Sequence, residues 1–334
     1  MSIYWLTNPF SNPLALPLAL LLLSTFGGAA LALQAVHFWR ATFSGKAATK
    51  RAAIVPESVL WQRYRTWVII AILFISATLM GPLAIAILCG FFCWQGGKEY
   101  AALMALPTHH RLILLLAGWA TLIAVLCWNT PVLTIAPILA FFGWSILALQ
   151  PIPDETEVGQ RFTIGLTAFW GYLYLGWLPA FLLALSMNKA PGFVLLVGFG
   201  VALSDVAAFC TGKLLSGLIG KKLAPRLSPN KTWGGLLGNL LGAVVAVGLT
   251  SFALPHLQFW QFGLLAVAIG LGSAWGDLLE SLLKRQCGVK DAGGLLPGFG
   301  GLLDRIDSLL LVAPLVYYVT SLLSTNNTLH LFIL

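Results

Sequence analysis

The stretch that decides the fold is WVIIAILFISATLMGPLAIAILCGFFCW, residues 67–94, which runs for 28 residues without a charged side chain. About 20 apolar residues cross a bilayer as a helix, so this stretch is too long for one crossing and short for two. Gly81-Pro82 stands at its middle, and these residue types interrupt helices and form turns. We predict a hairpin of two membrane helices that turns near Gly81-Pro82 and borrows flanking polar residues.

The basic residues on either side of this stretch favour the same hairpin. Loops 40–66 and 213–234 are both rich in Lys and Arg, and such loops lie in the cytoplasm by the positive-inside rule. A single crossing at 67–94 would put the two loops on opposite sides of the membrane, whereas a hairpin puts them on one side. Only Lys189 of the 19 basic residues then lies outside, and both termini are expected outside as well.

The rest of the chain is equally apolar. Of its 334 residues 59% are hydrophobic and only 9% are charged, and the mean hydropathy is +0.89. Soluble domains carry about 25% charged residues, so the composition excludes an ordinary soluble protein, a disordered chain and a nucleic-acid binder. The net charge of +8 is assigned to cytoplasmic loops. Further apolar segments lie at 14–39, 112–128, 131–149, 163–187, 192–212, 235–254, 259–283 and 305–323.

We therefore predict an all-α, polytopic integral membrane protein with about nine to ten transmembrane helices and no soluble domain. Residues 1–150 are expected to form N-terminal membrane helices with a basic loop at 40–66, and residues 151–334 the more charged, catalytic helices of the same membrane domain. No Lys or Arg precedes Arg40, so the first apolar segment is interpreted as a retained helix rather than a signal peptide. The five cysteines are expected to be free thiols.

Carboxylates gather near the ends of the last two apolar segments. Asp277, Glu280 and Lys284 are spaced i, i+3 and i+7 and share one helix face. Asp304 and Asp307 are spaced i, i+3 and share another. Carboxylates within or bordering a membrane span are costly and usually functional.

A glycine-rich loop, residues 290–301, joins these two acidic helices. Glycine exposes backbone N–H groups and permits close approach of phosphates. Carboxylates interleaved with Lys and Arg indicate Mg²⁺ together with a polyphosphate. The alternative is a set of helix-end charges in interfacial salt bridges. It accounts for any single residue, but poorly for three carboxylates on two spans that flank such a loop.

The same residues resemble a known family. SLLKRQCGVKD at 281–291 and LPGFGGLLDRIDS at 296–308 resemble the signature of the phosphatidate cytidylyltransferases, also called CDP-diacylglycerol synthases. SPNKTWGG at 228–235 resembles the family's Ser-Pro-Lys-Lys-Thr-Trp-Glu-Gly segment, and residues 204–213 resemble its Asn-Asp-x-x-Ala-Tyr-x-x-Gly-Arg segment. The likeness covers residues from about 160 to 320 well, and residues 1–150 only in hydropathy and in the Lys98-Glu99-Tyr100 region.

Four positions depart from the family pattern, one of them Ala207, which stands where the family has Gly. The signature has His where this chain has Phe299, Glu where it has Gly234, and Asn where it has Ser204. The metal-type aspartates are all kept. The resemblance therefore implies a divergent member with an intact metal core and altered surroundings for the nucleotide or lipid.

The resemblance implies the reaction of CTP with phosphatidate to give CDP-diacylglycerol and pyrophosphate, with Mg²⁺, in phospholipid biosynthesis. The lipid phosphate is already an anion at pH 7 and needs no general base, so the obstacle is electrostatic. We expect the catalytic residues to be Asp277, Asp304, Asp307 and Lys284. The three aspartates are the expected metal ligands, and Asp205 and Glu280 are further candidates. Expected to bind CTP and the lipid phosphate are Lys213, Ser228, Lys231, Thr232, Arg285, Lys290, Asp291 and Arg305.

The expected partners are CTP, phosphatidate or a related lipid phosphate, the bilayer and a second copy of the chain, but no nucleic acid. The expected location is a bacterial cytoplasmic membrane, with the site facing the cytoplasm. The alternatives are a CTP-dependent enzyme acting on another lipid phosphate or on a lipid alcohol, or an inactive paralogue. A lipid-alcohol kinase would need a base for the hydroxyl and release CDP. A transporter fits less well, because the charges cluster at one membrane face and not at midplane.

Overall fold

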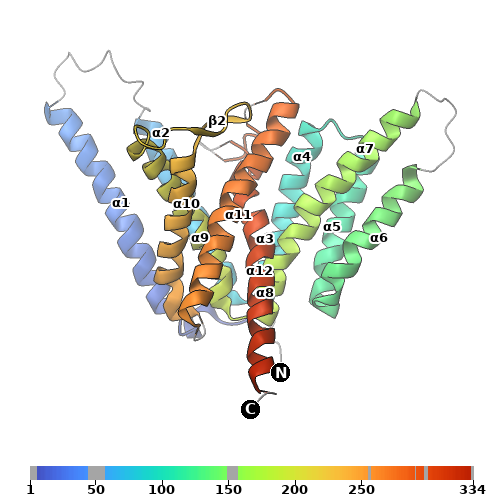
Figure 1. The fold of residues 1–334 in the computed structure, drawn as a ribbon, viewed down its shortest axis with the longest axis horizontal. Coiled ribbons are helices and arrows are strands. Elements are labelled where there is room, and N and C mark those ends of the chain that lie inside the picture. The colour runs from blue at the N-terminus through green and yellow to red at the C-terminus, as the bar shows by residue number, and fades with distance from the viewer. Residues whose placement is uncertain are drawn as a thin grey trace.

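The computed structural model describes residues 6–43, 57–148, 157–254, 257–289, 291–296 and 300–331 (Figure 1). Within these residues the chain forms ten helical rods. Seven of them are long and apolar enough to cross a membrane, so the chain is a polytopic membrane protein, as predicted. All five cysteines are free thiols.

The rods follow one another along the chain, and two of them contain a π-helical segment. The bounds are α1 Ala15–Phe43; α2 Glu57–Met80; α3 Pro82–Phe91 with η3 Phe92–Gly96 and α4 Gly97–Leu103; α5 Thr108–Trp128; α6 Pro131–Ala148; α7 Glu157–Tyr172 with η4 Leu173–Trp177 and α8 Leu178–Asn188; α9 Pro191–Leu214; α10 Trp233–Thr250; α11 Phe259–Gln286; and α12 Leu303–Leu331. Short 3-10 turns are η1 Pro9–Ser11 and η5 Ser251–Ala253.

One small β-hairpin departs from the all-α expectation. Strands β1 (Lys222–Ala224) and β2 (Ser228–Thr232) pair antiparallel between α9 and α10, with Lys222 opposite Thr232 and Ala224 opposite Ser228. The loop predicted at 40–66 is also shorter than expected, because residues 40–43 continue α1 and residues 57–66 begin α2.

The predicted turn at Gly81-Pro82 is confirmed. Gly81 has φ 102° and ψ −168°, a conformation that glycine adopts readily because it lacks a Cβ. Pro82 then begins α3, where its missing N–H costs nothing. Both arms extend beyond residues 67–94: α2 begins at Glu57, and the returning rod reaches Leu103. Each arm thereby gains the polar flank that the apolar stretch alone did not supply.

The hairpin gives the bundle one basic end. We use "basic end" for the end that carries β1, β2 and the junction between α11 and α12, the upper end in Figure 1. Following the rods in order, every described Lys and Arg except Lys189 lies at or near this end. This is the charge distribution expected if residues 67–94 form a hairpin that keeps the basic loops on one side of the membrane. That the basic end faces the cytoplasm remains a prediction.

Glycines let the last four rods approach closely. A Cβ at Gly242 of α10 would stand 2.5 Å from the Leu203 carbonyl oxygen of α9. A Cβ at Gly276 of α11 would stand 2.6 Å from the Asp307 carbonyl oxygen of α12. Small residues at such crossings bring backbones together in membrane helices. The two contacts place α9, α10, α11 and α12 around one shared space near the basic end.

We expect Gly276→Val to destabilise the protein by about 1–3 kcal/mol, because the new side chain has no room beside α12. Thermal unfolding of the detergent-purified protein measures the loss. Gly263→Val is the matched control on the same helix, since a Cβ at Gly263 meets nothing within 4 Å. Equal melting temperatures for the two variants would contradict the close α11–α12 contact.

Topology is tested by labelling cysteines in a variant without the five native ones. Gly159→Cys and Gly217→Cys add a Cβ into open space and are expected to react with a membrane-impermeant reagent from the cytoplasmic side. Ser251→Cys, at the opposite end of the bundle, is expected to react from the outside only. Labelling of residues 159 and 217 from opposite sides would contradict the fold described here.

Candidate functional site

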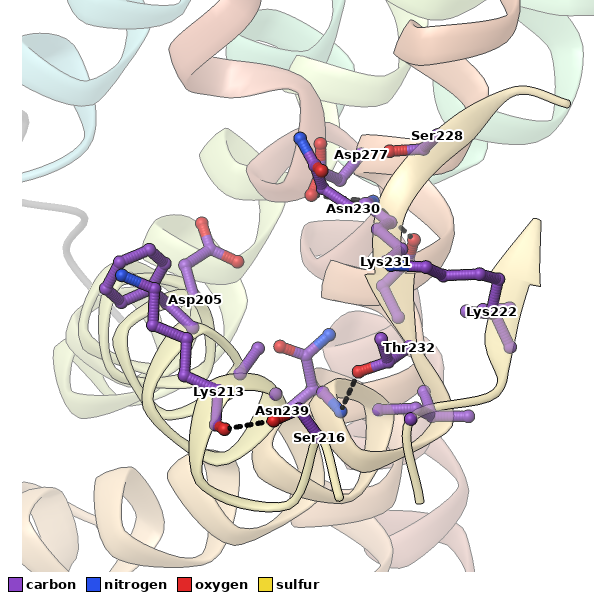
Figure 2. Close-up of a pocket in the computed structure, with 18 of the residues that line it drawn as sticks. Asp205, Lys213, Ser216, Lys222, Ser228, Asn230, Lys231, Thr232, Asn239 and Asp277 are labelled. Carbon is purple, nitrogen blue, oxygen red and sulfur yellow. Dashed lines mark hydrogen bonds and ion pairs between the residues drawn. The ribbon is translucent and has the colours of Figure 1, made fainter. Parts of the chain in front are cut away.

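A cavity of about 980 Å³ opens among α9, the β-hairpin, α10, α11 and α12. Figure 2 shows polar side chains of α9, the β-hairpin, α10 and α11 converging on it. Nine of the predicted site residues line it: Asp205, Lys213, Ser228, Lys231, Thr232, Asp277, Asp304, Arg305 and Asp307. The cavity thus unites positions that are separated by about a hundred residues in the chain.

Three carboxylates form a compact cluster beside this cavity. Asp277 and Glu280 lie on α11 and Asp307 lies on α12, and one oxygen of each falls within 4.8 Å of the others. Glu280 is 1% exposed and Asp307 is 6% exposed. Carboxylate oxygens are the ligands that Mg²⁺ prefers, so the cluster could hold a metal ion. Glu280, which the sequence supplied only as a further candidate, belongs to this cluster.

The Glu280 side chain supports the fit of a cation. Its Oε2 pairs with Lys284 Nζ at 2.6 Å, while its Oε1 is buried and has no hydrogen-bond partner among the described residues. A buried acceptor without a partner is costly. A cation held by the cluster, or a proton shared with the neighbouring Asp304 carboxylate, would satisfy it.

Asp304 is held differently from the other two predicted aspartate ligands. Its carboxylate accepts hydrogen bonds from Lys284 Nζ at 2.9 Å, from the Gly301 backbone N–H at 2.8 Å and from that of Ala292 at 3.1 Å. Asp304 thus ties the loop between α11 and α12 to both helices. Its role as a metal ligand remains a prediction, and the structure gives it a positioning role.

Four cationic side chains line the cavity: Lys213, Lys222, Lys231 and Arg305. Lys231 Nζ pairs with Asp277 Oδ2 at 2.6 Å, so an ammonium stands beside the acidic cluster. Lys213 Nζ lies 4.1 Å from the centre of the Phe209 ring. Lys222 was not among the predicted site residues, because in the sequence it is one of several loop lysines. Only its pairing opposite Thr232 in the β-hairpin turns it toward the cavity.

Several predicted substrate-binding residues have structural partners. Thr232 Oγ1 accepts a hydrogen bond from the Gly235 N–H at 3.1 Å and caps α10. Arg285 Nε donates to the Leu227 carbonyl at 3.3 Å, which fastens the β-hairpin to α11. Asp291 is exposed, and neither it nor Arg285 is among the residues that line the cavity. Lys290 and Phe299 lie outside the described residues.

Asp205 lies in the cavity wall but outside the carboxylate cluster. Its Oδ1 accepts a hydrogen bond from Ser273 Oγ of α11 at 2.8 Å, which joins α9 to α11. Its predicted use as a further metal ligand stays a prediction.

Glu99 of α4 is a residue that sequence reasoning did not select. It is 7% exposed, and its carboxylate accepts hydrogen bonds from the backbone N–H groups of Leu302 at 3.1 Å and Leu303 at 2.9 Å. A negative charge at a helix N-terminus is stabilised by the unpaired N–H groups and the helix dipole. Glu99 therefore anchors the start of α12, four residues before Asp307.

Glycines in the loop between α11 and α12 make room for the Glu99 side chain. A Cβ at Gly301 would stand 2.6 Å from Glu99 Oε2, and one at Gly293 would stand 2.8 Å from Glu99 Cδ. The amides of residues 292, 301, 302 and 303 all donate to Glu99 or Asp304. Within the loop, the amides of residues 292 and 301 therefore already donate to a carboxylate of the chain itself, and the use of the loop's other amides as a phosphate cradle stays a prediction.

We expect Glu99→Ala to destabilise the protein by about 1–3 kcal/mol, because two buried amides lose their acceptor. Glu99→Gln is the matched control: it keeps an acceptor oxygen and should retain much of the stability. Thermal unfolding with the two variants in parallel measures the difference. A melting temperature of Glu99→Ala equal to that of the natural protein would exclude the anchoring role.

Sequence comparison relates the chain to known proteins. The model of the Cytidylyltransferase family matches residues 61–323. A phosphatidate cytidylyltransferase of Brucella suis biovar 1 (strain 1330) is 38% identical over 196 residues, 53% of this chain and 72% of that protein. A protein of Escherichia coli (strain K12) named Uncharacterized protein YnbB is 37% identical over 182 residues, 53% of this chain and 60% of that protein. A phosphatidate cytidylyltransferase of Mycobacterium leprae (strain TN) is 38% identical over 152 residues, 44% of this chain and 47% of that protein.

Proposed function

The chain belongs to the cytidylyltransferase family, and we propose that it transfers the cytidylyl group of CTP to phosphatidate, forming CDP-diacylglycerol and pyrophosphate. The observation that carries the proposal is the single cavity in which cations meet carboxylates at one end of a membrane bundle. Similarity to proteins named phosphatidate cytidylyltransferase supports the choice of lipid. The basic end would face the cytoplasm of a bacterium, where CTP is found.

The chemistry needs charge neutralisation more than proton transfer. An oxygen of the lipid phosphate attacks the α-phosphorus of CTP, a new P–O–P bond forms, and the bond to the β-phosphate oxygen breaks to release pyrophosphate. The attacking oxygen already carries negative charge at pH 7, so no base has to remove a proton. The barrier comes from bringing two anions together, and fixed positive charge lowers it.

The carboxylate cluster would hold the divalent ion that such a triphosphate requires. Asp277, Glu280 and Asp307 supply hard oxygen donors within 4.8 Å of one another. Mg²⁺ bound there would supply positive charge against the phosphates. Lys284 pairs with Glu280 and with Asp304, so it positions carboxylates of both helices and stabilises the cluster.

The cations of the cavity would bind the phosphates. Lys213, Lys222 and Lys231 approach from α9 and the β-hairpin, and Arg305 approaches from α12. Phe209 also lines the cavity and is 63% exposed, so one wall adjoins the apolar face of α9. A lipid phosphate could enter there with its acyl chains still in the bilayer.

A second candidate keeps CTP but uses another lipid phosphate. Gly234, where the family signature has Glu, packs against the segment after α9: a Cβ there would stand 3.2 Å from Leu215 Cβ. A larger side chain would have to displace that segment. Gly234 does not itself line the cavity, but Gly235 beside it does, so this departure from the family pattern lies next to the cavity wall.

We expect Asp277→Asn, Glu280→Gln and Asp307→Asn each to lower turnover by roughly 100-fold or more, because each removes a charge from the metal cluster. The assay combines purified protein, labelled CTP, Mg²⁺ and a panel of lipid phosphates, with chromatographic detection of the CDP-lipid and pyrophosphate. Asp304→Asn is compared in the same assay, because Asp304 is joined to Glu280 through Lys284 but is not one of the three carboxylates that lie within 4.8 Å of one another.

Glu157→Gln, which changes a carboxylate at the start of α7, a helix that contributes no residue to the cavity lining, is the control and should retain turnover. A near-normal rate for Asp277→Asn, Glu280→Gln or Asp307→Asn at saturating Mg²⁺ would remove that residue from the proposed ligand set. No CDP-lipid from the natural protein with any lipid phosphate would overturn the proposed function.

A further inference from the structure

Asn239 of α10 is a buried polar residue in the cavity that the catalytic scheme leaves unused. It is 7% exposed and lines the cavity. Figure 2 shows its amide pointing into the space between Asp205 and Thr232. Its Oδ1 is buried without a hydrogen-bond partner among the described residues. Because a buried polar atom without a partner is costly, this amide is suited to a ligand.

The backbone around Asn239 is rigidly placed. Ser204 Oγ of α9 donates to the Asn239 carbonyl at 3.0 Å. The neighbouring Gly238 and Gly242 bring α10 against α9, since a Cβ at either would stand within about 2.6 Å of a backbone oxygen of α9. The amide is thus presented from the tightly packed pair of helices, and its position does not depend on a loop.

The chemistry of Asn239 Oδ1 limits which part of the two substrates it can bind. Oδ1 accepts hydrogen bonds, so its partner must be a donor. The glycerol and acyl part of phosphatidate carries ester oxygens, which only accept. The phosphates of both substrates are acceptors that suit the Lys residues and the carboxylate-bound cation. The nucleoside supplies the donors: the 4-amino group of cytosine and the ribose hydroxyls.

The cytosine edge matches the amide best. An Asn side chain presents an acceptor beside a donor, and cytosine presents its 4-amino donor beside the N3 acceptor. Two parallel hydrogen bonds can form, as amides make with bases elsewhere. Uracil has the reverse pattern, with an acceptor at position 4 and a donor at N3, and would match the amide only after a half-turn that exchanges Oδ1 and Nδ2, so the preference for cytosine depends on the amide keeping the orientation seen here.

We propose that Asn239 is a specificity-determining residue that reads the cytosine base of CTP, with Oδ1 accepting from the 4-amino group and Nδ2 donating to N3. The inference rests on the proposed function for its substrate. It adds a place for the base at the α10 wall, opposite the carboxylates of α11 and α12 that line the same cavity.

The test compares CTP and UTP on the natural protein, Asn239→Leu and Asn239→Ala. Equilibrium dialysis with Mg²⁺ and labelled nucleotide measures binding without lipid, and the transfer assay measures kcat and KM. We expect roughly a 10-fold or greater loss of CTP affinity and of kcat/KM for CTP in both variants. UTP values should change little, so that the CTP preference falls toward one, and KM for the lipid phosphate should stay the same.

Asn188→Leu is the matched control, because it removes an amide at the far end of α8, outside the cavity; it should keep the CTP preference.

Binding of dCTP distinguishes contact with the base from contact with the ribose hydroxyl. Because dCTP keeps the cytosine base, the Asn239 variants should lose affinity for dCTP as they do for CTP. The proposal would be overturned if folded Asn239→Leu and Asn239→Ala kept the CTP preference of the natural protein. It would also be overturned if only the KM for the lipid phosphate changed, or if the loss of affinity seen with CTP disappeared with dCTP. Selective CTP binding that depends on Asn239 in a protein without transfer activity would support it while rejecting the proposed function.

Discussion

The contact on which the site depends is the close passage of α11 against α12 at Gly276. Without a side chain at this position, the backbone of α12 comes near enough for Asp307 to join Asp277 and Glu280 within 4.8 Å. Ser308 Oγ donates to the Ser273 carbonyl one turn deeper, at 3.1 Å. Because both helices are long and apolar, this glycine crossing decides where their few carboxylates meet.

Gathering three carboxylates at the end of a membrane bundle is costly, and the surrounding residues reduce that cost. Lys284 bridges Glu280 and Asp304, and Lys231 pairs with Asp277. Glu99 and Asp304 receive the free amides where α12 begins. Glu280 Oε1 is nevertheless left without a partner among the described residues. An acceptor of this kind calls for a partner, and the three carboxylates around it could supply one by holding a cation.

Features of the fold and of the site could be predicted where they depend on residues close together in the sequence, and could not where they depend on residues far apart. The bilayer-length apolar runs and the turn at Gly81-Pro82 could be predicted, because they depend on residues that are neighbours in sequence. The pairing of Asp277 with Glu280 on one helix face also follows from helical spacing. Glu99 could not be found this way, since it lies about two hundred residues from the amides that it accepts. Asn239 likewise has meaning only through the cavity that it faces.

The sequence by itself determined that the chain is a polytopic membrane protein with its charge at one end, because burying charge in a bilayer is prohibitive and hydropathy records that constraint locally. It also determined which carboxylates and lysines were available. Only the tertiary structure decided that Glu280 rather than Asp304 completes the compact cluster, and that the glycine-rich loop receives carboxylates of the chain itself. Helix crossing and rotation, set by packing between distant residues, control which side chains meet, and no local pattern encodes them.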